Sequence, residues 1–396
     1  MPPLSFPDAR AAVLREVRAR HATFATETVS LSACHGRVLA QQIRADRDYP
    51  PFNRSARDGF AVRAADIPGR VRLIGEVRAG EMPNVSVGPG EAMEIMTGAP
   101  VPDGADAVVM VEHCERHQDD TVSTDRMLDA GANIAAHGSE ARANAVILPR
   151  GTRIDYTAVA FLAATGHSEI NVFTRPRVAI LATGDEIVAV DAVPAPHQIR
   201  NSNAWSLAAQ VERAGAIPVI LPVARDSKEE TRRLIEEGLN ADMLLLSGGV
   251  SAGKYDVVEL ALADLGAEFF FDRVLIQPGQ PLVFGRARDR FFFGLPGNPA
   301  STMVTFELFG RAALDLLSGA SDAPLNITLA RLTRSFRHKT GLTRFLPAQV
   351  RCAEVTPVDW QGSGDVPSLC RANAFLVADA DQAEYGQGEL IPVLLK

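Results

Sequence analysis

The sequence predicts a multidomain α/β protein with a doubly wound parallel-sheet domain, an inserted β domain, a helical or linker domain and a small C-terminal β domain. Its 396 residues are too many for one ordinary hydrophobic core. From Arg177 to Leu317, short apolar runs alternate with helical patterns, which is typical of a doubly wound parallel sheet. Residues 71–112 and 321–396 instead contain strand-like runs separated by glycine and proline clusters, which predict two β domains.

These changes in pattern predict where the domains begin and end. We expect residues 1–45 and 140–172 to form the helical or linker domain and residues 46–139 to form the inserted β domain. The doubly wound domain then covers residues 173–320 and the C-terminal β domain residues 321–396.

Composition narrows the classes of function. A formal net charge of -8 argues against a nucleic-acid-binding surface. No apolar run approaches the roughly 20 residues that a membrane-spanning helix needs, so no membrane partner is expected. The four cysteines form no C-x-x-C pair, which indicates free thiols in a reducing compartment. We therefore expect a cytoplasmic protein.

The N-terminal part is predicted to begin with helices. Ser5 followed by Asp8 resembles a capping box, so we expect an amphipathic helix over Ala9–Arg20. A second helix is expected over Cys34–Arg44. The stretch 46–67 that follows contains Pro50-Pro51 and many Arg and Asp residues, and is either a solvated crossing between domains or one wall of a site.

The elements of the doubly wound domain follow in alternation. We expect a strand in the run Arg177–Glu186, a helix over Asn203–Ala214, and a strand over Ile217–Val223. Asp226 is placed as the N-cap of the next helix, and a last helix is expected over Pro299–Leu317. Further strands are predicted at 268–271 and 291–293.

The run from Met243 to Asp256, MLLLSGGVSAGKYD, combines a buried strand, a glycine loop and the start of a helix. Such an arrangement presents backbone N–H groups to an anion. The G-x-x-x-x-G-K pattern ends at Lys254, but Tyr255 stands where a P-loop needs Ser or Thr. The loop is therefore not a Walker A motif, and it is either an anion cradle or a tight turn with Asp256 as N-cap.

Polar loops follow several strands of the predicted sheet. In a parallel sheet these loops meet at the carboxyl ends of the strands, where ligands bind. Each residue alone has an ordinary explanation as a cap, a solvated charge or a turn residue, but the common edge favours a site for a phosphate-bearing ligand and a divalent cation. The loops are Thr183-Gly184-Asp185-Glu186, Asp226, Ser247–Asp256 and Leu295–Pro299.

Six motifs together resemble the molybdopterin molybdenumtransferases, the MoeA and gephyrin E-domain family of molybdenum cofactor biosynthesis. The resemblance implies a homodimer of four-domain subunits. It also implies that adenylylated molybdopterin and molybdate react, with Mg²⁺, to give molybdenum cofactor and AMP. Whether a separate adenylyltransferase partner delivers the substrate stays open. The motifs are PPFNRSARDGFAVR (50–63), IMTGAPVPDGADAVVMVE (95–112), ILATGDE (180–186), IRNSN (199–203), SGGVSAGKYD (247–256) and LPGNPAS (295–301).

The resemblance, added to the predicted sheet edge, implies roles for individual residues. Glu186 and Asp256 are the expected magnesium ligands. The expected catalytic residues are Asp58, Glu186, Asp226 and Asp256, with Asp58 acting from the facing wall. The expected substrate-binding residues are Thr97, Thr183, Gly184, Asp185, Ser247, Gly248, Gly249, Ser251, Pro296 and Asn298.

One departure from the family pattern bears on the anion. Where the family has a K-P-G-K-P-like run, this chain has Gln277-Pro278-Gly279-Gln280-Pro281. Glutamine donates hydrogen bonds to an oxyanion but brings no charge. Two alternatives therefore stand beside the transferase: a non-catalytic paralogue that binds pterin or nucleotide as a scaffold, and a nucleotide pyrophosphatase acting on another adenylylated substrate.

Overall fold

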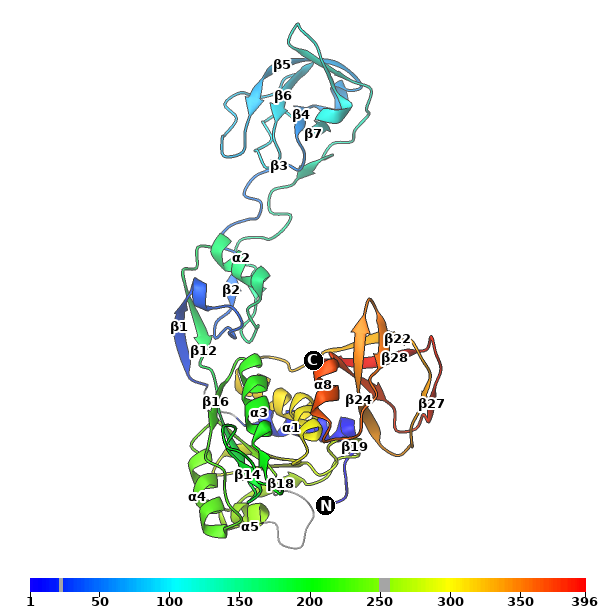
Figure 1. Ribbon diagram of the computed structural model, residues 1–396. Coiled ribbons are helices and arrows are strands. Elements are labelled where there is room, and N and C mark those ends of the chain that lie inside the picture. Colours follow the sequence, from blue (N-terminus) through cyan, green and yellow to red (C-terminus); the bar gives the residue numbers. More distant parts are fainter. Residues whose placement is uncertain (21–23, 249–256) are drawn as a thin grey trace. The chain divides into compact units, whose positions relative to one another are not determined.

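The computed structural model describes residues 1–20, 24–248 and 257–396. The chain divides into two compact units (Figure 1). The first comprises Met1–Gln41, Arg150–Val159 and Ser168–Lys396, and the second comprises Gln42–Pro149 and Ala160–His167. Each unit is described by itself.

The first unit contains a six-stranded mixed sheet. Its strands lie in the order β16 (Ile217–Ile220), β13 (Arg177–Ala182), β17 (Met243–Ser247), β21 (Arg290–Leu295), β20 (Val283–Ala287) and β18 (Glu268–Phe271). The first four strands are parallel, while β20 and β18 pair antiparallel at one edge. The predicted parallel sheet is confirmed, and the antiparallel edge, including all of β20, was not predicted.

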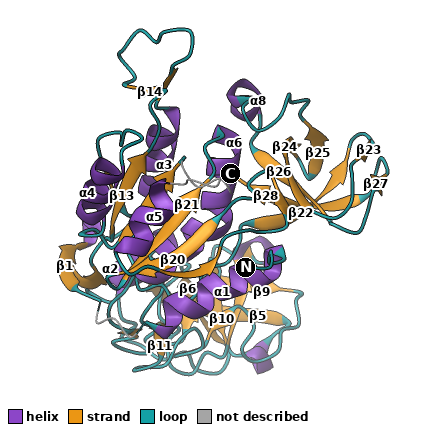
Figure 2. Cartoon of the chain, turned by 90° about the horizontal axis from the view of Figure 1, so that it is seen from below, coloured by secondary structure: helices purple, strands orange, loops and turns teal. Residues whose placement is uncertain are grey.

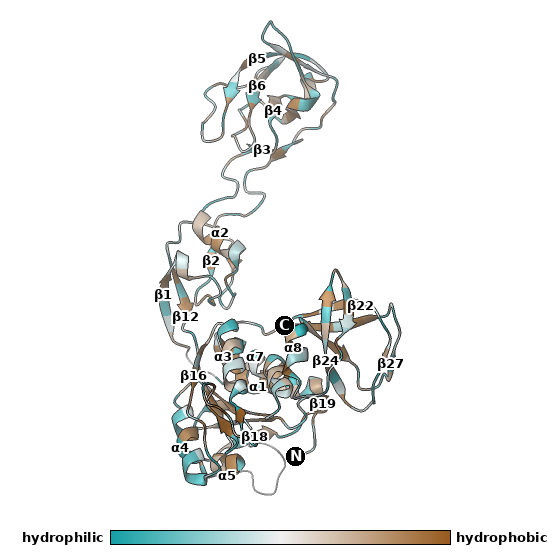
Figure 3. Ribbon diagram, viewed as in Figure 1, coloured by the Kyte–Doolittle hydropathy of each residue, from teal (hydrophilic) through white to brown (hydrophobic). Residues whose placement is uncertain are grey.

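Helices cover both faces of this sheet, which makes the domain doubly wound. Alternate strand residues enter two separate cores, as Val178 and Ile180 face one and Ala179 and Leu181 face the other. Figure 3 shows strands of this sheet in hydrophobic brown, whereas α4 carries much hydrophilic teal. The helices are α1 (Phe6–Ala19), α3 (Ser202–Arg213), α6 (Pro299–Thr305) and α7 (Arg311–Leu317) on one face, and α4 (Lys228–Gly238) and α5 (Val257–Asp264) on the other.

Local sequence explains several helix boundaries. Ser5 caps α1 by accepting a hydrogen bond from the Asp8 N–H, as predicted. Helix α4 is capped by Ser227 instead of Asp226, because the Ser227 hydroxyl accepts from the Glu230 N–H at 3.4 Å. Between α6 and α7 the helix continues through a π-helical turn, Phe306–Gly310.

The C-terminal domain is a small closed β-barrel with its own core. Strand β24 pairs with both β25 and β26, which closes the ring. The barrel strands are β24 (Thr343–Arg351), β25 (Glu354–Pro357), β22 (Ile327–Leu332), β28 (Leu390–Leu395) and β26 (Ala374–Ala378). The short helix α8 is Val366–Arg371, and β23 (Phe336–Arg337) pairs with β27 (Glu384–Tyr385).

A short segment connects this barrel to the N-terminal residues of the chain. The Leu4 N–H donates to the Arg273 carbonyl at 3.0 Å, and the Leu275 N–H donates to the Leu4 carbonyl at 2.8 Å. Strand β19 (Ile276–Gln277) follows and pairs in parallel with β24 of the barrel. Backbone hydrogen bonds therefore hold residues 273–277 on both sides.

The second unit is built around another six-stranded sheet (Figure 1), as expected of the inserted β domain. Its interior strand β4 pairs antiparallel with both β6 and β7. Small cores lie on its two faces. In order, the strands are β7 (Ala107–Met110), β4 (Gly59–Val62), β6 (Glu91–Ile95), β5 (Gly69–Val77), β9 (Thr121–Thr124) and β8 (Glu115–Arg116).

Short elements complete the described part of the chain. No helix among the described residues is long and apolar enough to span a membrane. The two-stranded pairs are β1 (Thr26–Ser30) with β12 (Glu169–Phe173), β2 (Ile43–Arg44) with β11 (Val146–Leu148), β3 (Arg54–Ser55) with β10 (Ile134–Ala135), and β14 (Ile187–Val188) with β15 (Ile199–Arg200). Helix α2 is Tyr156–Ala164, and 3₁₀ turns occur at Leu31–Ala33, Ala64–Asp66 and Val111–His113.

The helix expected over Cys34–Arg44 is wrong. After the Leu31–Ala33 turn the chain makes another turn at His35 and Gly36, and isolated bridges then pair Val38 and Leu39 with distant segments. The Leu39 N–H donates to the Thr152 carbonyl at 2.9 Å, and the Ala40 N–H donates to the Asn171 carbonyl at 3.0 Å. Tertiary pairing overrides the local helical pattern here.

Candidate active site

The strand order places a switch point between β13 and β17. Strand β16 follows β13 in the sequence and lies on one side of it, whereas β17, the next strand of the sheet, lies on the other. Connections that leave two adjacent parallel strands in opposite directions open a crevice at their carboxyl ends, where ligands bind in such folds. Figure 2 shows the loop that carries β14 projecting from the body of this domain beyond α3.

Backbone hydrogen bonds bring three predicted loops together at this crevice. The N–H of Thr183, after β13, donates to the Ser247 carbonyl at 3.1 Å, and the N–H of Gly248, after β17, donates to the Leu295 carbonyl at 3.3 Å. Gly248 has a φ of +90°, and a Cβ built on it would lie 2.8 Å from the Thr183 carbonyl oxygen. The loops after β13, β17 and β21 therefore meet at one edge of the sheet.

The loop after β13 also reaches the chain that follows β16. The Gly184 N–H donates to the Ala224 carbonyl at 3.1 Å, and the Asp226 N–H donates to Oδ1 of Asp185 at 3.2 Å. The side chains of Asp185 and Asp226 are exposed. Asp226 thus stands at the sheet edge with its carboxylate free of helix capping, because Ser227 caps α4.

Two asparagines at the start of α3 were missed by sequence reasoning. Asn201 is the N-cap of α3 and accepts from the Ala204 N–H at 3.1 Å. Asn203 uses its Nδ2 to donate to Oγ of Ser247 at 2.9 Å and to the carbonyl of Gly297 at 2.7 Å. The motif IRNSN contained both residues, but nothing in it distinguished them from ordinary helix-start residues.

A cleft of about 70 Å³ lies at this point. Four residues predicted for the site line it, namely Thr183, Glu186, Ser247 and Gly248, whereas the predicted Gly184, Asp185, Pro296 and Asn298 lie in the same loops outside the lining. Asp256, Gly249 and Ser251 lie outside the described residues. The lining consists of Ala182, Thr183, Glu186, Ile187, Ile199, Arg200, Asn201, Ser202, Asn203, Ser247, Gly248, Gly297 and Pro299.

Asp58 and Thr97 form a second group, within the second unit. The Thr97 N–H donates to Oδ1 of Asp58 at 2.6 Å. This backbone hydrogen bond, followed by one from the Thr97 hydroxyl, holds the pKa of Asp58 below its usual range. Asp58 is thus an exposed carboxylate kept in its ionised form.

The two glutamines of the predicted anion site are exposed and do not line the cleft. Gln277 is the last residue of β19 and so is positioned by the C-terminal barrel. The carbonyl of Gln280 accepts from the Val274 N–H at 3.0 Å, which closes the loop between them.

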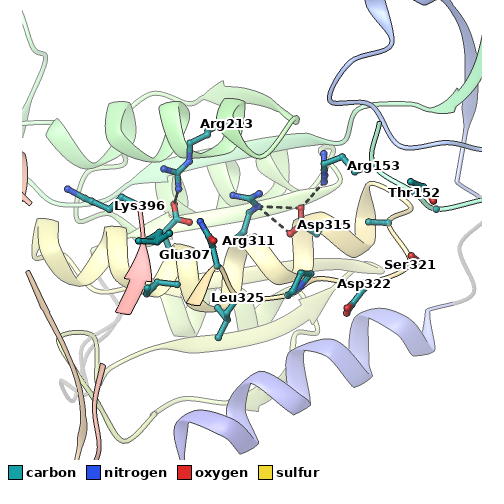
Figure 4. A pocket seen from close by; sticks show the side chains of 16 residues that line it. Thr152, Arg153, Arg213, Glu307, Arg311, Asp315, Ser321, Asp322, Leu325 and Lys396 are labelled. Carbon is teal, nitrogen blue, oxygen red and sulfur yellow. Dashed lines mark hydrogen bonds and ion pairs between the residues drawn. The ribbon is translucent and has the colours of Figure 1, made fainter. Parts of the chain in front are cut away.

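A larger cavity of about 720 Å³ lies elsewhere in the first unit, beside α7 and the chain that leads into the barrel (Figure 4). Several of its charged side chains form ion pairs. The carboxylate of Asp315 lies 2.8 Å from the guanidinium of Arg153 and 3.3 Å from that of Arg311. Arg213 lies 2.6 Å from the carboxylate of Glu307. These contacts connect helices and linkers of the unit, and none of the predicted site residues lines this cavity.

Three family models match successive parts of the chain. The MoeA N-terminal region (domain I and II) matches residues 4–166, the probable molybdopterin binding domain matches residues 179–316, and the MoeA C-terminal region (domain IV) matches residues 329–396. Together they cover most of the sequence, and the middle model coincides with the doubly wound sheet that carries the cleft.

Individual relatives agree with the models. The chain is 36% identical over 386 residues to the molybdopterin molybdenumtransferase of Bacillus subtilis, which covers 93% of this chain and 90% of that protein. The crystal structure of the molybdopterin biosynthesis moeA protein from Pyrococcus horikoshii OT3 has a TM-score of 0.79 at 28% identity, with 100% of both chains covered. Another solved structure, of a molybdopterin biosynthesis moea protein from Pyrococcus horikosii, has a TM-score of 0.71 at 30% identity and 99% coverage of both chains. The chain therefore belongs to the MoeA family, the molybdopterin molybdenumtransferases.

Proposed function

We propose that this protein inserts molybdate into adenylylated molybdopterin and releases AMP, in a magnesium-dependent step of molybdenum cofactor biosynthesis. The observation that carries the proposal is the cleft at the β13–β17 switch point, where Glu186 and two glycine-containing loops meet. The part of the chain that forms it matches a probable molybdopterin binding domain. Two relatives that match 93% of this chain, at 36% and 32% identity, are named molybdopterin molybdenumtransferase.

The loops at the sheet edge suit a pyrophosphate. Backbone N–H groups that follow Ser247 would bind its oxygens, because a glycine loop between a strand and a helix presents such groups to an anion. Asp226 lies beside the loop after β13, because its N–H donates to Oδ1 of Asp185. Attack of water on the pyrophosphate breaks one P–O bond and leaves AMP and molybdopterin, whose dithiolene sulfurs bind the molybdenum.

The residues present fit magnesium in their donor chemistry. Glu186 offers exposed carboxylate oxygens at the cleft, and Mg²⁺ prefers oxygen ligands. Among the described residues no three acidic, histidine or cysteine side chains form a complete metal site, and the second proposed ligand, Asp256, is not among those residues. When bound, the ion would supply positive charge against the pyrophosphate.

Asp58 and Thr97 are proposed to meet the same substrate from a facing wall, in a homodimer. The ionised state of Asp58, maintained by Thr97, suits a group that accepts hydrogen bonds from the substrate and orients it. We also propose a cytoplasmic location and delivery of the substrate by an adenylyltransferase partner.

Gln277 and Gln280 favour one alternative, a paralogue that binds its ligand without inserting molybdate. Both side chains are exposed at a loop that the barrel positions, so they are accessible to an oxyanion but add no charge to attract it. The transferase remains the better-supported function, because a binding scaffold does not need carboxylates at both Asp58 and Glu186.

AMP release by the purified protein tests the proposal. The protein is incubated with adenylylated molybdopterin, with and without molybdate and with and without magnesium. The transferase requires AMP release that depends on both. AMP release that ignores molybdate would identify a pyrophosphatase, and substrate binding with no release would identify a scaffold.

Variants connect the activity to the cleft. Asp256→Ala and Glu186→Gln should each reduce AMP release at least a hundredfold, since each removes a proposed magnesium ligand. Glu237→Gln, on the exposed face of α4, is the matched control and should retain full activity. Full activity in Glu186→Gln would remove this carboxylate from the mechanism.

A further inference from the structure

Two hydrogen-bonding atoms in the cleft have no partner among residues 1–20, 24–248 and 257–396. Oγ1 of Thr183 and Oδ1 of Asn203 are both buried and unbonded, and Thr183 is only 6% exposed. Both residues line the cleft, Thr183 directly after β13 and Asn203 in the first turn of α3. Of the buried side-chain oxygens and nitrogens in the described part of the chain, four lack a partner, and these are two of them. Buried polar atoms in folded proteins are normally bonded, so two in one cleft require an explanation.

The orientation of Asn203 is determined by its surroundings. Its Nδ2 donates to the carbonyl oxygen of Gly297 at 2.7 Å and to Oγ of Ser247 at 2.9 Å. Turning the amide over would place Oδ1 against the Gly297 carbonyl oxygen, where two acceptors would repel each other. The amide oxygen is therefore held at the cleft as an acceptor, and no donor among the described residues reaches it.

The hydrogen-bonding capacity of Oγ1 of Thr183 and Oδ1 of Asn203 determines which ligand groups can bind beside them. Phosphate oxygens are acceptors and cannot bond to an amide oxygen. A group with N–H donors satisfies Asn203 directly, and the Thr183 hydroxyl can accept a second hydrogen bond. A cleft of about 70 Å³ admits the edge of a ring, because whole ligands occupy pockets of roughly 300–1,000 Å³.

We propose that Asn203 and Thr183 are specificity-determining residues that bind the N–H edge of the pterin ring, while the pyrophosphate lies outside the cleft. The inference rests on the proposed function, because it assumes an adenylylated pterin substrate. A pterin carries an amino group and an adjacent ring N–H, which are two donors on one edge. These donors supply the two hydrogen bonds that the cleft lacks, and a substrate without them leaves both acceptors unsatisfied.

Binding of a simple pterin tests this assignment without any catalysis. Neopterin, whose fluorescence reports binding, is titrated into the full chain in the presence of EDTA, so that no divalent cation contributes. Thr183→Val and Asn203→Leu should each weaken neopterin binding about tenfold, and Thr183→Ser should restore it. Thr231→Val is the matched control, because Thr231 is also buried but its hydroxyl donates to the Arg225 carbonyl at 3.2 Å.

Stability separates ligand recognition from a structural role. Removing an unbonded buried hydroxyl should leave the thermal midpoint of free Thr183→Val equal to or above that of the wild type, whereas Thr231→Val should lower it. A lower midpoint in Thr183→Val with unchanged neopterin affinity would overturn the inference. Absence of neopterin binding by the wild type up to millimolar concentration would overturn it as well.

Kinetic measurements distinguish pterin recognition by Asn203 from a role of Asn203 in cation binding, and they test the transferase function independently. In the AMP-release assay, Asn203→Leu should raise the KM for the adenylylated pterin and leave the magnesium concentration for half-activation unchanged. A shift in the magnesium requirement alone would assign Asn203 to the cation and refute pterin recognition. If the wild type binds neopterin through Thr183 and Asn203 but releases no AMP, the transferase proposal fails and the pterin cleft stands.

Discussion

Gly248, directly after β17, should not tolerate a side chain, so we expect Gly248→Ala to destabilise the protein. Its φ of +90° lies in the left-handed region, which costs a residue with a Cβ about 1–2 kcal/mol. In addition, the new Cβ would lie 2.8 Å from the Thr183 carbonyl oxygen, a backbone atom that cannot move away alone. Such overpacking adds about 1–3 kcal/mol. We therefore expect a total destabilisation of about 2–5 kcal/mol.

Gly266→Ala is the matched control. Gly266 follows α5 with a φ of +73°, and a Cβ there would meet no atom within 4 Å. This variant measures the conformational cost alone, about 1–2 kcal/mol. Urea titrations followed by circular dichroism compare the two variants, and AMP release is measured on both. Gly248→Ala should be the less stable and lose most activity. Equal destabilisation would show that Gly248 has room for a side chain, and the close approach of the two loops would be refuted.

Three further predictions follow from other parts of the chain. The pKa of Asp58, ordinarily 3.8, is lowered by Thr97, so this contact stabilises the protein above the unfolded-state pKa, and the stabilisation is lost as pH falls through the lower folded-state pKa. Asp58→Asn should remove this acid dependence from thermal midpoints measured between pH 2 and 6. An unchanged dependence would contradict the prediction. Asp315→Asn should destabilise the first unit by about 2–3 kcal/mol in urea titrations, because the buried carboxylate is shared by two arginines that are about a third exposed and partly hydrated. A loss of unfolding free energy below about 0.5 kcal/mol would show that these ion pairs contribute little to stability. Gln277→Lys combined with Gln280→Lys should lower the molybdate concentration for half-maximal AMP release about tenfold by adding positive charge, and no change would place the anion elsewhere.

The sheet edge could be predicted from the sequence because its cause is local and topological. Apolar runs such as Met243–Leu246, each stopped by a polar or glycine loop, mark buried parallel strands. Parallel strands then place their loops at a common edge, so the meeting of Thr183, Ser247 and Gly248 followed from the alternation of strands and helices.

The remaining features depend on tertiary contacts that leave no local pattern. Asn203 differs from any asparagine at a helix start only through its contacts with Ser247 and Gly297. The segment after Cys34 looked helical, yet its backbone pairs with residues more than 100 positions away. Ser227 and Asp226 are equally good caps by residue type, and the backbone at the strand end selects Ser227.

The segment from Arg273 to Gln277 has a consequence for how this protein can be dissected. Leu4 hydrogen-bonds it on one side and β24 on the other, so remote parts of the sequence shape the loop that begins at Gln277. A fragment containing only the doubly wound domain would leave the backbone groups of this segment exposed to water and the glutamine loop without a template. Molybdate affinities measured on such a fragment would report on a glutamine loop with a different conformation. A fusion partner placed directly before Leu4 would also disturb the segment from Arg273 to Gln277.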